Sequence, residues 1–175
     1  MVELLDYYVI VTGVGQCAVD AVNAATPSPA LARVCLHVPG QIAWDDCQCG
    51  SFAQTAGPWA WSEMGRAEAP WFGDDNLCRP EYLGLTVTAE VLRCVTGPGE
   101  DLSPSCTALA ADSRQWHKDA MAMRRGIVCC LEQMRTSQQL ASYQILSHAP
   151  AGPQGMCAGS TLTYRIWLPN CDCSA

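Results

Sequence analysis

The longest amphipathic stretch of the chain lies at residues 103–135 and reads SPSCTALAADSRQWHKDAMAMRRGIVCCLEQMR. Ser103 offers an N-cap hydroxyl, and Pro104 suits the first helical position, where its missing amide donor does no harm. These residues predict a helix from 104 to about 135 that lays one face on a sheet. Its apolar stripe consists of Leu109, Trp116, Ala120, Met123, Ile127, Cys130, Leu131 and Met134.

Alternating apolar and polar residues on both sides of this helix predict strands, because side chains along a strand point to opposite faces in turn. The alternation indicates strands at 31–38, 83–96, 141–149 and 157–168, with a shorter one near 50–56. A first helix is expected over about 3–24. The chain is therefore predicted to be one α+β domain over 1–175, with an antiparallel sheet of about four strands and two helices packed on one face.

Composition limits the class of protein further. The 175 residues are 49% hydrophobic and 15% charged, which is typical of a globular chain. The formal charge is −7 and no Lys/Arg-rich run occurs, which disfavours dedicated nucleic-acid binding. The N-terminal residues lack a basic segment, and Asp6, Gly13 and Gly15 interrupt the apolar stretch that follows, so a signal peptide or a membrane span is not expected.

Residues 40–82 form the least periodic part of the chain and are predicted to be an irregular contact segment. Tryptophan outside a regular core is enriched in protein interfaces, although packing of the segment on its own domain is an equal alternative. Pairs of acidic residues in this segment and at 100–101 are candidates for a pore lining or an interface. The alternative interpretation is that they are ordinary solvent-exposed acids in turns. The interface or pore candidates are Trp44, Asp45, Asp46, Trp59, Trp61, Trp71, Asp74, Asp75, Glu100 and Asp101.

Twelve cysteines are more than an intracellular chain usually carries. The C-x-C and C-C spacings bring two thiolates to one zinc ion poorly, so no metal is predicted. Buried thiols and structural disulfides are the competing interpretations, and connectivity stays open. The candidate structural cysteines are Cys47, Cys49, Cys94, Cys106, Cys129, Cys130 and Cys157.

Catalytic signatures are absent from the sequence. The histidines at 37, 117 and 148 accompany no recognised nucleophile motif, and Gly13-Val-Gly15 lacks the remaining residues of a nucleotide-binding loop. We expect no enzyme activity, no catalytic residues and no cofactor.

Five short motifs, in order, resemble a known family. They are His37-Val-Pro-Gly40 followed by Ala43-Trp-Asp-Asp-Cys47, Arg93-Cys94, Pro104-Ser-Cys106 with Cys129-Cys130, and Pro153-Gln-Gly-Met-Cys157. The sequence is similar over about 35–168 to head-to-tail connector proteins of long-tailed actinobacteriophages, the tail terminators among them. Cys49 and the Cys171-Asp-Cys173 tail depart from the family pattern, and 57–82 does not match it.

The resemblance implies a structural virion protein of the phage neck. Such a protein would form a ring of six subunits that caps the tail tube, ends tail growth and joins the tail to the head connector. Its partners would be further copies of itself, the major tail tube protein, stopper or connector proteins, and DNA that passes through the lumen without specific binding, with no membrane involved. The chain would be made in the host cytoplasm and end in the virion.

Three alternatives remain open at this point. A head–tail stopper or adaptor ring would occupy a different position in the same neck. A cysteine-rich, disulfide-stabilised binding module and a small cysteine-dependent enzyme belong to other classes.

Overall fold

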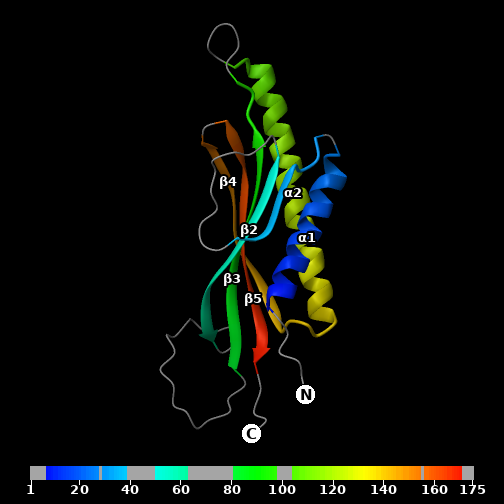
Figure 1. The fold of residues 1–175 in the computed structure, drawn as a ribbon, viewed down its shortest axis with the longest axis vertical. Helices are drawn as coiled ribbons and strands as arrows, with labels where there is room; N and C mark the ends of the chain where they lie inside the picture. The colour runs from blue at the N-terminus through cyan, green and yellow to red at the C-terminus, as the bar shows by residue number, and fades with distance from the viewer. Residues whose placement is uncertain are drawn as a thin grey trace.

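The computed structural model describes residues 7–27, 29–38, 50–62, 81–97, 104–154 and 156–170, and within them it is an α+β structure (Figure 1). Two long helices and five strands make up this part of the chain. In order they are α1 (Tyr7–Ala25), β1 (Arg33–Val38), β2 (Ser51–Ser62), β3 (Glu81–Cys94), α2 (Cys106–Thr136), β4 (Ser142–Gln154) and β5 (Cys157–Asn170).

The sheet has five strands in the order β1-β2-β3-β5-β4, and it is mixed. Strand β1 pairs parallel to β2, whereas all other neighbours pair antiparallel. The predicted α+β class is therefore correct, but the predicted antiparallel sheet of about four strands is wrong in detail. Alternation of apolar and polar residues shows which face of a strand is buried. It looks the same whether the neighbouring strand is parallel or antiparallel, so it could not reveal that β1 and β2 are parallel.

Strand β2 is longer than the sequence suggested, because it continues past residue 56 to Ser62. Its register with β3 shifts between Ala56 and Trp59, where Gly57 adopts a φ of 137°. A Gly-Pro pair usually ends a strand, but here a β-bulge carries the strand through it. Trp59 and Trp61 consequently belong to the sheet, and the irregular segment predicted over 40–82 is interrupted by this strand.

Helix α2 begins later than predicted. Ser105, not Ser103, is the N-cap, and its hydroxyl accepts a hydrogen bond from the Ala108 amide at 3.2 Å. Pro104 therefore precedes the cap instead of opening the helix. The sequence offers serines on both sides of this proline, and only the tertiary position of the chain selects between them.

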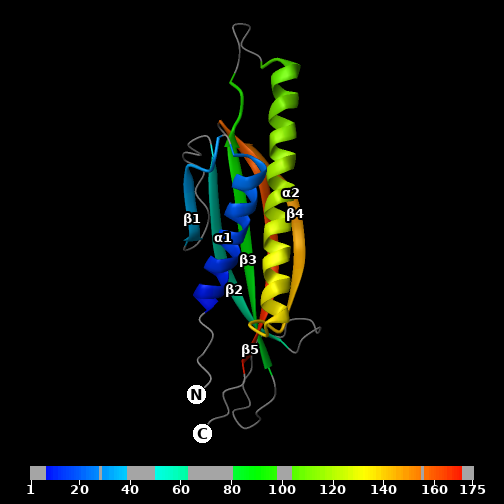
Figure 2. The same cartoon turned by 90° about the vertical axis from the view of Figure 1, so that its right-hand side faces the viewer.

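Both helices cover the same face of the sheet, as Figure 2 shows. The core between the layers is built from aliphatic side chains that alternate along the strands and recur at helical spacing along α1 and α2. Its fully buried members include Val11, Val14, Val22, Leu85, Val87, Met123, Ile127, Leu131, Leu162 and Ile166.

One polar side chain crosses this core. The buried amide of Gln54 on β2 donates to the Val11 carbonyl at 2.7 Å, and its oxygen accepts from the Tyr164 hydroxyl at 3.0 Å. Burial raises the pKa of Tyr164, which keeps the phenol protonated as a donor. A side chain at Gly15 would meet the same amide at 3.1 Å, so this glycine permits α1 to lie close to β2 without interrupting the helix.

Helix α1 is long and apolar enough to cross a membrane by length and composition alone. In the structure its apolar face, including Ile10, Val14 and Val19, is buried against the sheet and α2. This burial is what a core helix of a globular domain requires.

Candidate functional site

A cavity of about 350 Å³ lies between the N-terminal half of α2 and the β4–β5 edge of the sheet. Apolar atoms dominate its walls. We call it the α2–β4 pocket and define it by Trp116, His117, Met121, His148, Pro150 and Ser160. Its volume is at the lower end of the range for ligand sites.

Two polar groups of the pocket residues lack a hydrogen-bond partner within the described part of the chain. They are the indole Nε1 of Trp116 and the hydroxyl of Ser160, and both atoms are buried. Ser160 is only 4% exposed, since it lies on the helix-facing side of β5 next to Leu162. Buried donors are usually satisfied, and an unsatisfied one costs about 1–3 kcal/mol, so these two atoms reduce the stability of the fold locally.

The two histidines at the rim are in different environments. His117 is exposed, and its Nδ1 lies 2.8 Å from the Ser113 carbonyl one turn earlier on α2. Partial burial, with the positive charge of Arg124 as the second cause, lowers the pKa of His148. His148 is therefore neutral near pH 7 and can either donate or accept a hydrogen bond.

A second exposed surface lies at the opposite edge of the sheet. Tyr7, Tyr8 and Val9 form the first turn of α1 and are 37%, 49% and 63% exposed, and we call them the tyrosine patch. The Tyr8 ring meets the His37 ring of β1 edge-on at 5.4 Å between centroids. This contact orients the patch beside β1.

The two surfaces lie on opposite flanks of the molecule. Strands β1 and β4 are the two edges of the sheet. Figure 2 shows α1 beside β1 on one flank and α2 beside β4 on the other. Exposed Val34 on β1 and exposed Leu146 on β4 extend the apolar character along both edges.

The middle of the sheet face away from the helices is polar, whereas Leu92, Ala151 and Cys157 form a small buried apolar cluster. Thr86, Thr88 and Glu90 of β3 point to this side, and each contacts a residue of β5. The contacts are Arg165 Nε to Thr86 at 3.2 Å, Thr88 to Thr163 at 3.4 Å, and Thr161 to Glu90 at 3.0 Å. Among the described residues, no helix covers this face (Figures 1 and 2).

A buried ion pair and its hydrogen bonds join the end of β3, the segment after α1, and helix α2. Arg93 Nε at the end of β3 donates to Asp119 of α2 at 2.7 Å, and both side chains are almost completely buried. Thr26 and Gln115 donate to the other carboxylate oxygen, at 2.8 and 3.1 Å, and Arg93 Nη1 donates to the Pro29 carbonyl. The cluster stays enclosed within the fold, so we interpret it as structural.

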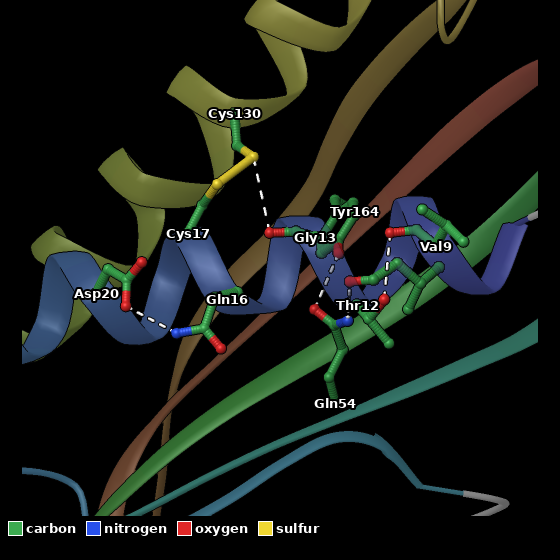
Figure 3. The surroundings of a disulfide bond; sticks show 10 residues. Val9, Thr12, Gly13, Gln16, Cys17, Asp20, Gln54, Cys130 and Tyr164 are labelled. Carbon is green, nitrogen blue, oxygen red and sulfur yellow. Dashed lines mark hydrogen bonds between the residues drawn. A yellow bond between two sulfur atoms is a disulfide. The ribbon is translucent and has the colours of Figure 1, made fainter.

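The cysteines separate into bonded and free groups. Cys130 of α2 forms a disulfide with Cys17 of α1, and their Cα atoms are 6.3 Å apart (Figure 3). Cys94 and Cys157 are also disulfide-bonded. Cys106 and Cys129 are exposed free thiols. Cys17 was not among the sequence candidates, because its helical position looks like that of any small core residue.

Most interface candidates from the sequence cannot be placed. Trp59 and Trp61 lie in β2, opposite Leu85 and Leu83 of β3. The others lie outside the described residues, together with Cys47 and Cys49: they are Trp44, Asp45, Asp46, Trp71, Asp74, Asp75, Glu100 and Asp101.

Sequence reasoning missed the α2–β4 pocket. Trp116 was assigned to the apolar stripe of α2, and His117 and His148 were considered only as possible catalytic groups. The sequence offered one signal for this pocket, which is that Trp116 and His117 are adjacent on the predicted helix and Met121 follows one turn after His117. The strand that lies beside them could not be known from this pattern.

Comparison with known proteins adds no assignment, since the sequence matches no family model and no curated protein.

Proposed function

We propose that this protein is a ring-forming structural subunit of a phage neck, and specifically a tail terminator that caps the tail tube and joins it to the head connector. The observation that carries the proposal is the presence of two different exposed apolar surfaces on opposite flanks of the sheet, one on α1 beside β1 and one between α2 and β4. The motifs that resemble connector proteins supply the biological setting.

A subunit that joins its neighbours head to tail needs two unlike surfaces, one on each flank. The tyrosine patch beside β1 and the α2–β4 pocket beside β4 meet this requirement, because they differ in shape and lie at the two edges of the sheet. Subunits that repeat the same contact form a closed ring if a whole number of the rotations between neighbours adds up to a full turn, and an open filament if it does not. Six subunits is the number that the resemblance implies.

The test is assembly of the full-length protein alone and on tail tubes. Light scattering after size exclusion gives the mass, and electron microscopy distinguishes a closed ring from an open filament. Purified tubes of the phage tail protein are then mixed with the chain, and we expect it to sit at one tube end and stop further growth. Tubes that keep growing with no density at either end would overturn the tail-terminator proposal.

A stopper or adaptor ring is the alternative within the same neck. It would bind the head-proximal connector first and leave bare tail tubes unchanged, so the order of binding separates the two roles.

A disulfide-stabilised binding module is the second candidate function. The Cys17–Cys130 bridge and the bonded state of Cys94 and Cys157 favour it, because structural disulfides persist in oxidising surroundings. A monomer that stays monomeric with tubes and connectors, and whose bridges are complete when it is first made, would support this class.

A further inference from the structure

We propose that the exposed side of helix α2 is a contact surface for the phosphate backbone of duplex DNA. This surface, which we call the basic face, consists of Arg114, Lys118, Arg124 and Arg125, and all four residues are exposed. The contact is independent of DNA sequence. The inference adds to the proposed neck function and rests on it only for the setting in which DNA is met.

Helical spacing gathers these cations on one side of α2. Arg114, Lys118 and Arg125 are separated by four and seven residues, so they lie above one another on a helix with about 3.6 residues per turn. The buried residues Met123 and Ile127 occupy the opposite side, toward the sheet. No other helix or strand of the described part lies over the basic face (Figures 1 and 2). The sequence shows no basic run because residues from the other sides of the helix stand between the cations.

No carboxylate neutralises the basic face within the described residues. Its four cations form no ion pair there. The acids of α2 have other partners: Asp112 accepts a hydrogen bond from the Thr96 amide at 2.8 Å. Asp119 and Glu132 form ion pairs with other arginines of the chain. The basic face is therefore a concentrated positive charge that is available to an anionic partner.

The acidic character of the whole chain does not cancel this local charge. The formal charge is −7, but exposed charges that are more than about 8 Å apart are largely screened at physiological ionic strength. A phosphate in contact with the basic face therefore interacts mainly with the cations of that face. Acids elsewhere on the surface repel DNA and restrict the contact to α2.

The dimensions and chemistry of the basic face suit a DNA backbone. From Arg114 to Arg125 the helix rises about 16 Å, a length over which a duplex carries roughly nine phosphate charges. Three of the four cations are arginines, whose planar guanidinium group can form two hydrogen bonds to one phosphate. Evenly spaced phosphates can meet these cations in any sequence, whereas an acidic protein surface would need carboxylates at matching positions. The observations therefore favour DNA over an acidic protein.

The experiment is fluorescence anisotropy of a short labelled duplex, titrated with the full-length protein at several salt concentrations. If all four cations contact phosphates, the logarithm of the affinity should fall with the logarithm of the salt concentration with a slope of about −3.6, or about −0.9 per contact. A duplex of unrelated sequence should give the same affinity and slope, because phosphate contacts carry no sequence information.

Two matched double variants test the basic face itself. Arg114→Gln with Arg125→Gln should weaken binding at low salt about tenfold or more and make the slope shallower by about 1.8. Arg33→Gln with Arg135→Gln removes the same charge from exposed positions outside the face and should leave affinity and slope nearly unchanged. Circular dichroism of both variants verifies that the fold is intact.

Three results would overturn the inference. The first is the absence of salt-dependent duplex binding at low salt, and the second is equal weakening in the two double variants. The third is binding of poly-glutamate, but not of duplex DNA, through Arg114 and Arg125, which would identify an acidic protein as the partner.

The outcome is separable from that of the proposed function. A chain that caps tail tubes but does not bind duplex DNA overturns this inference alone. A chain that binds DNA through the basic face and leaves tail tubes uncapped supports the contact and overturns the tail-terminator role.

Discussion

The Arg93–Asp119 pair is the residue-level feature with the strongest consequence for folding. Removing two charges from water is expensive, and here the cost is offset by their mutual contact and by the donors Thr26 and Gln115. Either partner alone would be a buried, uncompensated charge. The pair thus locks β3 to α2 at one end of the sheet.

Replacing one partner of this pair should therefore destabilise the protein strongly. We expect Arg93→Met or Asp119→Leu to lower the free energy of unfolding by about 3–5 kcal/mol, measured by urea denaturation. The double variant should recover most of that loss, because no unpaired charge remains and the Thr26–Gln115 hydrogen bond persists. The exposed Glu132–Arg135 pair is the control, and Arg135→Ala should change stability little. Losses that simply add in the double variant would contradict this account.

His148 is the residue whose titration reports on the α2–β4 pocket. Partial burial and the Arg124 charge lower its pKa below the ordinary 6.5. A histidine with a depressed folded-state pKa binds fewer protons than it does unfolded, so its contribution to stability falls as pH drops from about 6.5 toward the folded value. Since much of the ring is in solvent, that change is small.

NMR titration of the imidazole resonances should therefore place the His148 pKa below 6.5. The Arg124→Gln variant should move it upward, though not fully back, because burial is the larger cause. The unmodified protein, titrated under the same conditions, is the reference. An unchanged His148 midpoint in the variant would show that Arg124 does not act on it.

At the scale of elements, helices α1 and α2 approach each other closely at Gly126. A Cβ at Gly126 would lie 2.5 Å from the Cys17 carbonyl oxygen and 2.8 Å from the Ala21 Cβ. No side chain fits there without moving the helices apart. The glycine thus sets the helix spacing, which in turn brings Cys17 within bonding distance of Cys130.

Gly126→Ala should consequently be destabilising by about 1–3 kcal/mol in thermal or urea unfolding, despite the better helix propensity of alanine. Gly13→Ala on α1 is the matched variant. Its Cβ would meet only the flexible end of Met134 at 3.2 Å, so we expect a neutral effect or a gain of up to about 1 kcal/mol. Equal effects of the two substitutions would show that the helix contact is looser than described.

At the scale of the whole molecule, the Cys17–Cys130 bridge closes a loop across most of the chain. The two residues are separated by 113 positions, and the bridge joins both helices above the sheet (Figure 3). Crosslinks over long loops restrict the unfolded chain most, and loops of this length correspond to about 4–5 kcal/mol.

The Cys17→Ala, Cys130→Ala variant should therefore unfold at a markedly lower urea concentration, with a loss of stability on the order of 4 kcal/mol. Cys129→Ala, which removes the exposed free thiol beside it, should behave like the unmodified protein. Reductant should lower the stability of the unmodified protein at least as far, because it also opens the bonds of Cys94 and Cys157. If the double variant and the unmodified protein unfold together, the bridge is not a stabilising element.

Local patterns were sufficient for the elements of this fold. Helical spacing placed α2 within two residues at its start and one at its end, and alternation located β3 and β5, because each pattern depends only on neighbours along the chain. The ends of the elements were less predictable. Strand β2 continues through Gly57 and Pro58, and Ser105 is the N-cap of α2 in place of Ser103. The position of each of these ends depends on the tertiary contacts of the chain around it.

The candidate site was much less predictable than the fold. Trp116, His148 and Ser160 are separated by up to 44 positions and form one pocket only because α2 crosses the β4–β5 edge. In the same way, only the fold shows that Asp119 of α2 lies beside Arg93 of β3, which is 26 positions earlier in the chain.

The sequence by itself determined that this is an α+β domain with a long amphipathic helix and alternating strands, since periodicity of apolar residues follows directly from helix and strand geometry. Tertiary structure alone decided the parallel pairing of β1 with β2, the partner of Cys130, and the two unlike edges of the sheet. These features join residues that are distant along the chain, and such contacts are selected by packing of the whole core, which no local pattern encodes.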